Sequence, residues 1–230
     1  MRIIAGTHRG RRILPPATDS TRPITDRVKQ SLFDLLSPRI EGANVLDLFA
    51  GTGSMGLESL SRGAAHATFF ESDRSAVKLL RQNIDALKLA PLSTVIATDL
   101  FKWFKSDFKT VQTRVAVAPK GHLLAQTKQS APLGQPLRGD TTPSLNHSAA
   151  DPPLHADLVF LDPPYRFLVE RSNDLRELAT QLAQRHLSPE AIVIFRHDRD
   201  DVLELPALRR YDQRVYGSMM LEFLTASTAG

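Results

Sequence analysis

Apolar residues in the first hundred positions recur at two spacings. Short continuous apolar runs predict strands buried on both faces of a sheet, and runs with an apolar residue every three or four positions predict helices. The predicted strands lie at 45–49, 67–70 and 93–97. Four helices are predicted: one that begins near Thr25-Asp26, one that ends at about Arg62, one from Asp73 to Lys88, and a short one at 100–105. Strands separated by helices of this length indicate parallel units with right-handed crossovers.

The same alternation returns near the C-terminus. The expected elements are a strand at 156–161, a helix at about 172–185, a strand at 191–195 and a closing hairpin of 209–216 and 219–224 around Gly217-Ser218. Together the segments predict an α/β fold with a seven-stranded, mostly parallel sheet and an antiparallel C-terminal hairpin.

Between these two parts the pattern is interrupted. The stretch from Lys109 to His155 contains no Phe, Tyr or Trp but six prolines. It therefore offers little apolar surface to offset the entropy of ordering it. We expect a disordered insertion at about 109–155 within a single domain spanning 25–230, preceded by an N-terminal arm at 1–24.

Composition narrows the class of protein. The chain has 230 residues, 42% of them hydrophobic, which is the usual share for a globular protein with a sizeable core. It has no cysteine, which excludes disulfides, thiolate metal sites and cysteine nucleophiles, and we expect no metal. It shows neither an apolar run as long as a membrane span nor the pattern of a signal peptide. We expect a cytoplasmic protein that does not contact membranes.

Positive charge is concentrated at the start of the chain. The net charge is +4, whereas the first thirty residues hold seven basic and two acidic side chains. A basic arm ahead of a nearly neutral body indicates a polyanionic partner such as nucleic acid. A solvated, flexible terminus would account for the same composition.

A glycine-rich segment follows the first predicted strand and opens a helix. Its sequence, Gly51-Thr52-Gly53-Ser54-Met55-Gly56, matches the G-x-G-x-x-G fingerprint of nucleotide-binding folds. Gly51 and Gly53 let the backbone turn tightly and approach a ligand. Glu71 ends the next strand, where a carboxylate can accept hydrogen bonds from ribose hydroxyls. We predict a nucleoside-type ligand; glycines that serve only a tight turn are the alternative.

Two aspartates have two interpretations each. Asp47 interrupts an apolar strand and must be satisfied by a partner. In methyltransferases with this kind of nucleotide-binding fold, an acidic residue at this place holds the amino acid end of S-adenosylmethionine; the alternative is a carboxylate that caps a helix or stabilises the neighbouring turn. Asp99, at the end of the third predicted strand, either accepts from an adenine amino group or caps the helix that follows.

The segment Asp162-Pro163-Pro164-Tyr165 directly follows the strand at 156–161, at the sheet edge where α/β folds bind ligands. Prolines lack an N–H group and fix φ, so the segment offers rigid carbonyls beside a carboxylate. Such acceptors match an exocyclic amine and would direct its lone pair at an electrophile. Tyr165 gives a base a flat face for stacking. A Pro-Pro turn with a capping Asp is the interpretation without chemistry.

This motif resembles that of the amino-methyltransferases, which modify exocyclic nitrogens of nucleobases. More narrowly, most of the chain outside about 106–155 resembles the RsmD family of bacterial 16S ribosomal RNA guanine-N2 methyltransferases. The similarity is carried by Arg2–Gly6 with Gly10–Arg12, Thr21–Val28, Leu32-Phe33, Val45–Gly56, Glu58–Ala64, Phe70-Glu71, Asp157–Tyr165 and Tyr216-Gly217. The resemblance implies a class I methyltransferase fold that uses S-adenosylmethionine.

The resemblance also implies roles for individual residues. The implied cofactor contacts are Asp47, Gly51, Gly53, Glu71 and Asp99, with Arg22 and Thr25 beside the methyl-donor pocket; the implied catalytic contacts are Asp162, Pro163 and Tyr165; and the implied contacts to RNA phosphates are Arg9, Arg11 and Arg12. The long insertion departs from the family pattern. So do Arg196 and His197, because the family commonly has an acidic residue after this strand. We interpret Arg196 and His197 as an exposed turn.

The resulting hypothesis is methyl transfer from S-adenosylmethionine to N2 of a guanine in 16S ribosomal RNA, free or in the assembled small subunit, by a monomer. One alternative is the same chemistry on adenine N6 of DNA, which the motif permits. Another is a nicotinamide-dependent oxidoreductase, which would leave the segment at 162–165 unexplained. A third is a non-catalytic RNA-binding assembly factor, which has no need of an acceptor motif.

Overall fold

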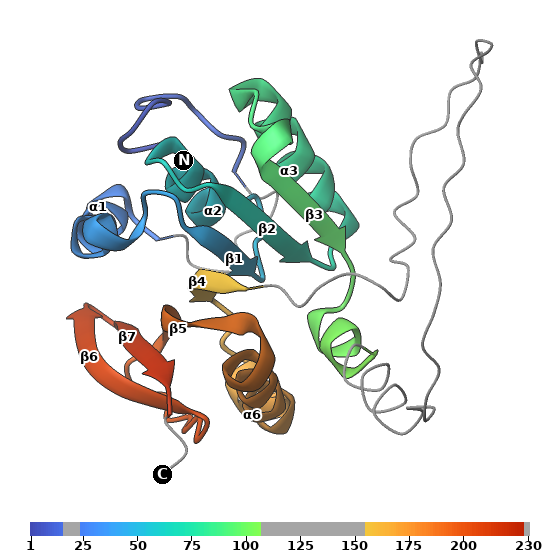
Figure 1. Ribbon diagram of the computed structural model, residues 1–230, viewed down its shortest axis with the longest axis vertical. Helices are drawn as coiled ribbons and strands as arrows, with labels where there is room; N and C mark the ends of the chain where they lie inside the picture. The colour runs from blue at the N-terminus through green and yellow to red at the C-terminus, as the bar shows by residue number, and fades with distance from the viewer. Residues whose placement is uncertain (16–23, 107–154, 228–230) are drawn as a thin grey trace, which may run out of the picture.

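The computed structural model of the chain describes residues 1–15, 24–106 and 155–227. Its strands are β1 (Asn44–Leu48), β2 (His66–Glu71), β3 (Ser93–Ala97), β4 (Ala156–Leu161), β5 (Leu187–Asp198), β6 (Leu208–Tyr216) and β7 (Met219–Ala226). Within the described ranges they form one seven-stranded sheet in the order β3-β2-β1-β4-β5-β7-β6 (Figure 1). Strands β1 to β5 pair in parallel, and β7 runs antiparallel between β5 and β6. The predicted sheet and its C-terminal hairpin are confirmed.

Helices connect the strands, and two of them, α1 (Asp26–Leu36) and α3 (Arg74–Leu87), begin where the sequence supplies a capping side chain. The others are α2 (Ser54–Ser61), α5 (Phe167–Glu170) and α6 (Ser172–Gln181), with short helical turns at Ser37–Arg39, Ala90–Leu92 and Leu182–His186 and a further helix at 100–106. The Thr25 hydroxyl accepts from the backbone N–H of Val28, and the Asp73 carboxylate accepts from that of Ala76. Both caps satisfy backbone donors at a helix start that have no partner within the helix.

Helices cover both faces of the sheet, which explains why its strands are apolar throughout. The helices α1, α2 and α3 lie on one face, and α6 and the helix at 100–106 lie on the other (Figure 1). Alternate residues of β4 serve the two layers: Leu158 and Phe160 pack towards α1, whereas Val159 and Leu161 pack towards α6. A strand buried on both faces reads as a continuous apolar run because neither face meets water.

Strand β5 is longer than its apolar run indicates. It extends through Arg196 and His197, which pair with Leu221 and Met220 of β7. The two residues are 8% and 4% exposed. The interpretation of Arg196 and His197 as an exposed turn is therefore wrong. The antiparallel partner β7 continues the ladder past the end of β4 and buries side chains that sequence polarity places at the surface.

The N-terminal segment packs against the body of the domain. Arg2 and Arg12 form an antiparallel bridge, and the neighbouring Ile3 and Ile13 join the core on the α1 side of the sheet. The carboxylate of Glu58 in α2 accepts hydrogen bonds from the backbone N–H groups of residues 4 and 5, at 2.7 and 3.0 Å. Residues 1–15 thus form a packed hairpin-like segment.

Two expectations fall on parts of the chain that the structure does not describe. The insertion expected at about 109–155 lies outside the described residues except for His155, and so does Arg22. In the parts that are described, no helix combines the length and the apolar character needed to cross a bilayer.

Candidate active site

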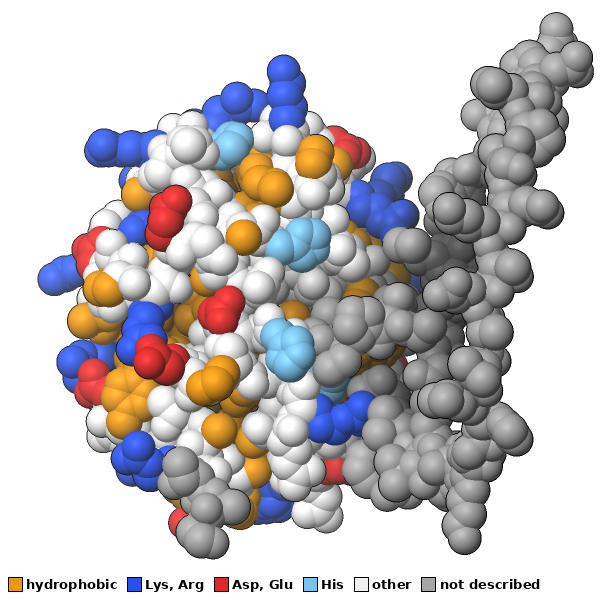
Figure 2. Space-filling model, in the orientation of Figure 1, with side chains coloured by type: hydrophobic (Ala, Val, Ile, Leu, Met, Phe, Trp, Pro, Cys, Tyr) orange, Lys and Arg blue, Asp and Glu red, His pale blue; other side chains and the backbone are white. Residues whose placement is uncertain are grey.

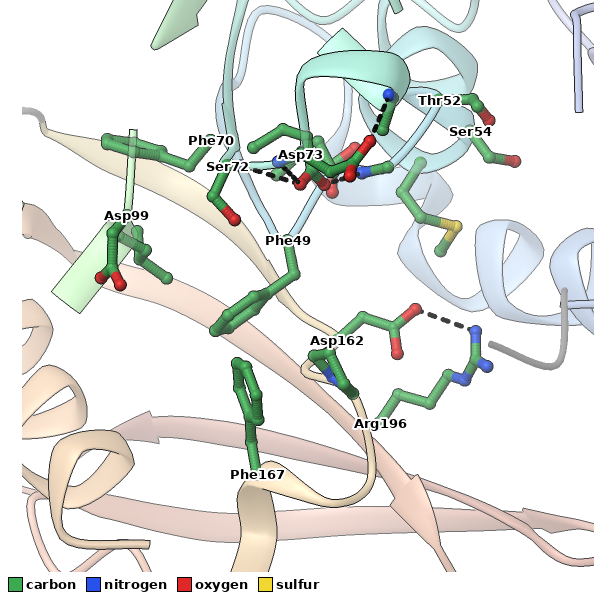
Figure 3. Close-up of a pocket in the computed structure, with 18 of the residues that line it drawn as sticks. Phe49, Thr52, Ser54, Phe70, Ser72, Asp73, Asp99, Asp162, Phe167 and Arg196 are labelled. Atoms are coloured by element: carbon green, nitrogen blue, oxygen red, sulfur yellow. Dashed lines mark hydrogen bonds and ion pairs between the residues drawn. The ribbon is translucent and has the colours of Figure 1, made fainter. Parts of the chain in front are cut away.

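A cavity of about 500 Å³ opens at the carboxyl edge of the sheet. Its volume lies in the range of small-molecule sites. Five residues singled out from the sequence line it together: Asp47, Gly51, Glu71, Asp99 and Asp162. They lie at or just beyond the ends of four strands that are neighbours in the sheet, which is where open α/β folds bind their ligands (Figure 3).

The two glycines of the loop after β1 have different roles. Both have positive φ, 55° at Gly51 and 85° at Gly53. A Cβ atom at Gly51 would meet nothing within 4 Å, so this position leaves its backbone open to the cavity. A Cβ atom at Gly53 would lie 2.4 Å from Cδ1 of Leu80, so this glycine lets α2 begin close against α3. Gly51 lines the cavity, and Gly53 supports the loop from behind.

Glu71 holds the glycine loop in place. Its Oε2 atom accepts from the backbone N–H of Gly51 at 2.8 Å, and its Oε1 atom accepts from those of Ser72 and Asp73 at 2.7 and 2.8 Å. Each carboxylate oxygen has two lone pairs, so Oε2 can accept one more hydrogen bond. The side chain therefore fixes the loop and still offers an acceptor to a hydroxyl group in the cavity.

Asp47 is a buried carboxyl group at the floor of the cavity. It is 2% exposed, and its Oδ2 atom accepts from the backbone N–H of Gly56 at 2.9 Å. Burial raises the pKa of Asp47 to about 8, although this hydrogen bond favours the charged form. The charges of Asp162 and Glu71 raise it further. The two interpretations of Asp47 combine, because it stabilises the first turn of α2 and also presents an acceptor suited to a cation.

Asp99 lies on the rim of the cavity. One oxygen accepts from the backbone N–H of Lys102 at 3.1 Å, which caps the helix at 100–106. The other lies 3.4 Å from Nη1 of Arg171, whose guanidinium is 4.0 Å from the centre of the Phe101 ring. The capping role is therefore present, and the carboxylate also faces the cavity.

Of the two residues expected beside the methyl-donor pocket, the structure describes Thr25. Its hydroxyl caps α1 and its side chain is exposed, while the preceding residue, Ile24, lines the cavity. Thr25 thus sets the start of α1 but does not itself line the cavity.

Three aromatic rings that the sequence reasoning missed form one wall of the cavity. The ring centres of Phe49 and Phe167 are 6.0 Å apart, those of Phe49 and Phe101 are 5.7 Å apart, and those of Phe101 and Phe167 are 6.1 Å apart. Figure 3 shows Phe49 and Phe167 facing each other beside Asp162. Phe49 has φ 66°, a conformation that costs energy for a bulky residue and often marks a functional site. Its place directly before the glycine loop is the signal that could have identified it.

Asp162 meets an arginine from the next strand. Its Oδ2 atom accepts from Nη1 of Arg196 at 2.8 Å, and the Asp162 side chain remains 29% exposed (Figure 3). Burial raises the pKa of Asp162 above its ordinary value, and the positive charge of Arg196 acts in the opposite direction. Arg196 itself lines the cavity. Like the three aromatic residues, Arg196 is a residue of the site that sequence reasoning did not find.

The two prolines of the motif present different carbonyls. The carbonyl of Pro164 accepts from the backbone N–H of Phe167 at 2.8 Å, where the chain turns into α5. The carbonyl of Pro164 is therefore engaged within the protein, unlike the free carbonyls expected of this segment. Within residues 1–15, 24–106 and 155–227, no donor reaches the carbonyl of Pro163. The Tyr165 ring lies beside Arg196, with its centre 5.9 Å from Cζ of the guanidinium.

The arginines expected to bind RNA are exposed but do not converge on one place. Nη2 of Arg11 donates to the carbonyl of Ala86 near the end of α3, at 2.8 Å. Arg9, together with Arg2 and Arg27, lines a second cavity of about 340 Å³. Figure 2 shows basic side chains along the edge of the molecule that carries the N-terminal segment and α1. Over the described ranges, no group of three or more His, Cys, Asp or Glu side chains is placed to hold a metal ion.

Comparison with known proteins decides the family. A family model described as Conserved hypothetical protein 95 matches residues 1–119 and 123–225. The chain belongs to this family, the RsmD family. A Haemophilus influenzae relative, ribosomal RNA small subunit methyltransferase D, is 32% identical over 208 residues, which cover 90% of this chain and 83% of that protein. The Escherichia coli protein of the same name is 49% identical over 88 residues, or 38% of this chain and 44% of that protein.

The RsmD resemblance inferred from the sequence is thus confirmed, and so is the fold. A solved structure of a methyltransferase from Escherichia coli superposes with a TM-score of 0.69 at 26% identity, covering 100% of this chain and 99% of that one. This RsmD-family chain is a class I methyltransferase in fold.

Proposed function

We propose that this RsmD-family chain transfers a methyl group from S-adenosylmethionine to the exocyclic N2 of a guanine in 16S ribosomal RNA. The enzyme class, the cofactor and ribosomal RNA as substrate follow from family membership and from the named relatives. The guanine N2 position is the finer part of the proposal. The observation that supports it is the carboxylate of Asp162, which lines the same cavity as the carboxylates of Asp47, Glu71 and Asp99.

The residues present fit S-adenosylmethionine. This cofactor supplies a methyl group bound to a sulfonium, which leaves as a neutral thioether. Asp47 would hold the ammonium of its amino acid end, because a buried carboxylate without a cation of its own gains most from one. Glu71 would accept from the ribose hydroxyls and Asp99 from the adenine amino group. Gly51, which carries no Cβ atom, leaves the space that these contacts need.

Asp162 and the carbonyl of Pro163 act on the target amine. Each would accept one N–H hydrogen bond, which turns the nitrogen lone pair towards the methyl carbon. As the nitrogen–carbon bond forms, the nitrogen becomes positively charged and must lose one proton. The Asp162 carboxylate stabilises this charge and takes the proton or passes it to water. Tyr165 would stack on the base, which has to leave its own stack to reach the cavity.

The remaining parts of the proposal concern the setting. The domain of residues 25–230 would act as a monomer in the cytoplasm, on free 16S RNA or on the assembled small subunit. The arm of residues 1–24 would bring Arg9, Arg11 and Arg12 to RNA phosphates. The exposure of all three arginines, and the place of Arg9 in a cavity that Arg2 and Arg27 also line, support such a contact.

Mass-spectrometric mapping of ribosomal RNA tests the base and the position together. RNA from cells that lack the chain is compared with RNA from cells complemented by the natural chain or by Asp162→Ala. We expect one N2-methylguanine of 16S RNA to be missing without the chain and restored only by the natural one. Unchanged 16S RNA, together with label transferred from tritiated S-adenosylmethionine to duplex DNA, would support the adenine N6 alternative instead.

A further inference from the structure

The sheet register brings Arg196 and Asp162 together. Strands β4 and β5 are parallel neighbours, and Leu161 lies opposite Phe195. The next residues, Asp162 and Arg196, therefore leave the same edge of the sheet side by side, on the face that α1 covers. Nη1 of Arg196 lies 2.8 Å from Oδ2 of Asp162, and both side chains line the cavity (Figure 3).

This arginine is held more rigidly than an ordinary surface arginine. It is 8% exposed, and its backbone is paired with Leu221 of β7. Burying a guanidinium costs free energy unless a partner compensates its charge, and Asp162 is one such partner. The contact uses one carboxylate oxygen, so Oδ1 of Asp162 remains an acceptor for a ligand.

We propose that Arg196 is a positioning residue for methyl transfer: it fixes the Asp162 carboxylate through Oδ2, so that Oδ1 meets the N–H of the target amine. This inference rests on the proposed function, because Asp162 has to contact the amine. Arg196 acts through Asp162 and needs no contact of its own with the base.

The charge of Arg196 gives this role a signature in the pH profile. The charged and titratable groups around Asp162 are Arg196 on β5, Asp47 on β1, Glu71 on β2, and Tyr165 and Arg166 in its own loop. Burial favours the protonated form of Asp162, and the charge of Arg196 opposes it. Without Arg196 the pKa of Asp162 would increase. Since the carboxylate is the form that accepts from the amine, the acid limb of kcat would move to higher pH.

The test compares Arg196→Met and Arg196→Lys with the natural chain. The matched control is Arg199→Met, which removes an arginine three residues further along that is 56% exposed and pairs with Asp200. Methyl transfer to small-subunit RNA is measured from pH 5.5 to 9, and S-adenosylmethionine affinity is measured by calorimetry. For Arg196→Met we expect kcat at pH 7 to fall about tenfold and the acid limb to rise by about one unit, the usual effect of one nearby charge. The cofactor affinity of Arg196→Met stays within about twofold of the natural value. Arg196→Lys recovers part of the lost kcat and part of the shift of the acid limb, and Arg199→Met leaves the acid limb where it is in the natural chain.

Two outcomes would overturn the proposal. One is Arg196→Met with the natural kcat and acid limb. The other is a loss of kcat with an unmoved limb and no recovery by Arg196→Lys, which indicates a structural role only. A carbon-13 titration of the Asp162 carboxyl in both proteins tests the same point without RNA. If the pKa of Asp162 is the same in Arg196→Met and in the natural chain, the role of Arg196 is contradicted even when no RNA is methylated. If the natural chain fails to methylate RNA, that result counts against the proposed function alone.

Discussion

Two carboxylates of this chain lie in largely buried surroundings, and they differ in how many protein donors surround them. Glu58 in α2 is 0% exposed. Its donors are the backbone N–H groups of Ile4 and Ala5, Nζ of Lys29 at 3.2 Å and Nε of Arg62 at 2.8 Å. Four donors occupy most of the lone pairs that a carboxylate offers. Glu58 is therefore a structural centre that ties the N-terminal segment to α1 and α2.

Among the described residues, Asp162 has one protein donor, Arg196, and its side chain faces a cavity. Its remaining lone pairs can accept hydrogen bonds from a ligand, and each such bond would contribute favourably to the free energy of binding. If Asp162 acts as proposed, the difference between Glu58 and Asp162 means that burial alone does not identify a functional carboxylate. What marks it is burial combined with acceptor capacity that the protein leaves unused on a cavity wall.

The largest effect should follow from removing the Asp162 carboxylate, which has unused acceptor capacity. In the proposed mechanism Asp162 orients the amine and stabilises its charge, so we expect Asp162→Ala to lower kcat for methyl transfer about a thousandfold. S-adenosylmethionine affinity, measured by calorimetry, should change less than about threefold, because the proposal gives Asp162 no contact with the cofactor. Asp162→Asn is the matched control: it keeps one acceptor oxygen, and its kcat should lie between those of Asp162→Ala and the natural chain. Parallel loss of cofactor binding in Asp162→Ala would show that Asp162 belongs to the cofactor site.

Removing the Glu58 carboxylate, which the protein's own donors surround, should lower the stability of the fold instead. Glu58→Ala leaves Lys29, which is 3% exposed, and Arg62 without their shared acceptor. Breaking one side of a buried pair is expected to lower the free energy of unfolding by about 3 kcal/mol, measured by urea denaturation. The control is Asp34→Ala, because Asp34 is a 60% exposed partner of the same Arg62 at 3.8 Å and should contribute less than about 1 kcal/mol. Equal effects of the two substitutions would contradict the contrast between Glu58 and Asp162.

Local sequence patterns predict one of these carboxylates and not the other. Asp162 directly follows an apolar run, and in a parallel sheet every such run ends at the same edge, so its place beside Asp47 and Glu71 is readable from the sequence. Glu58 acts on residues more than fifty positions away, and no local pattern reports that contact. Arg196 was missed for the same reason. Its strand continues past the apolar run because β7 pairs with it, and that pairing depends on a hairpin more than twenty residues further along the chain.

Asp47 combines the burial of Glu58 with the open acceptors of Asp162, and it predicts a pH dependence. Because burial raises its pKa to about 8, Asp47 is mostly protonated in the free protein at pH 7. A bound ammonium group favours the carboxylate, so cofactor binding should release a proton below pH 8. Affinity should then fall as pH decreases from 8 to 6, by at most about tenfold per unit.

Calorimetry of S-adenosylmethionine binding in two buffers of different ionisation enthalpy measures both the affinity and the proton released. Asp47→Asn keeps the hydrogen bond from Gly56 but cannot ionise, so its affinity should be weaker and nearly independent of pH in this range. The stability of the free protein depends on pH in the opposite direction from the cofactor affinity. A raised carboxyl pKa means that the stability contributed by Asp47 is complete below its ordinary value of 3.8 and is lost as pH rises through 8. A natural chain whose cofactor affinity stays constant from pH 6 to 8 would show that Asp47, like Glu58, is already satisfied by the protein itself.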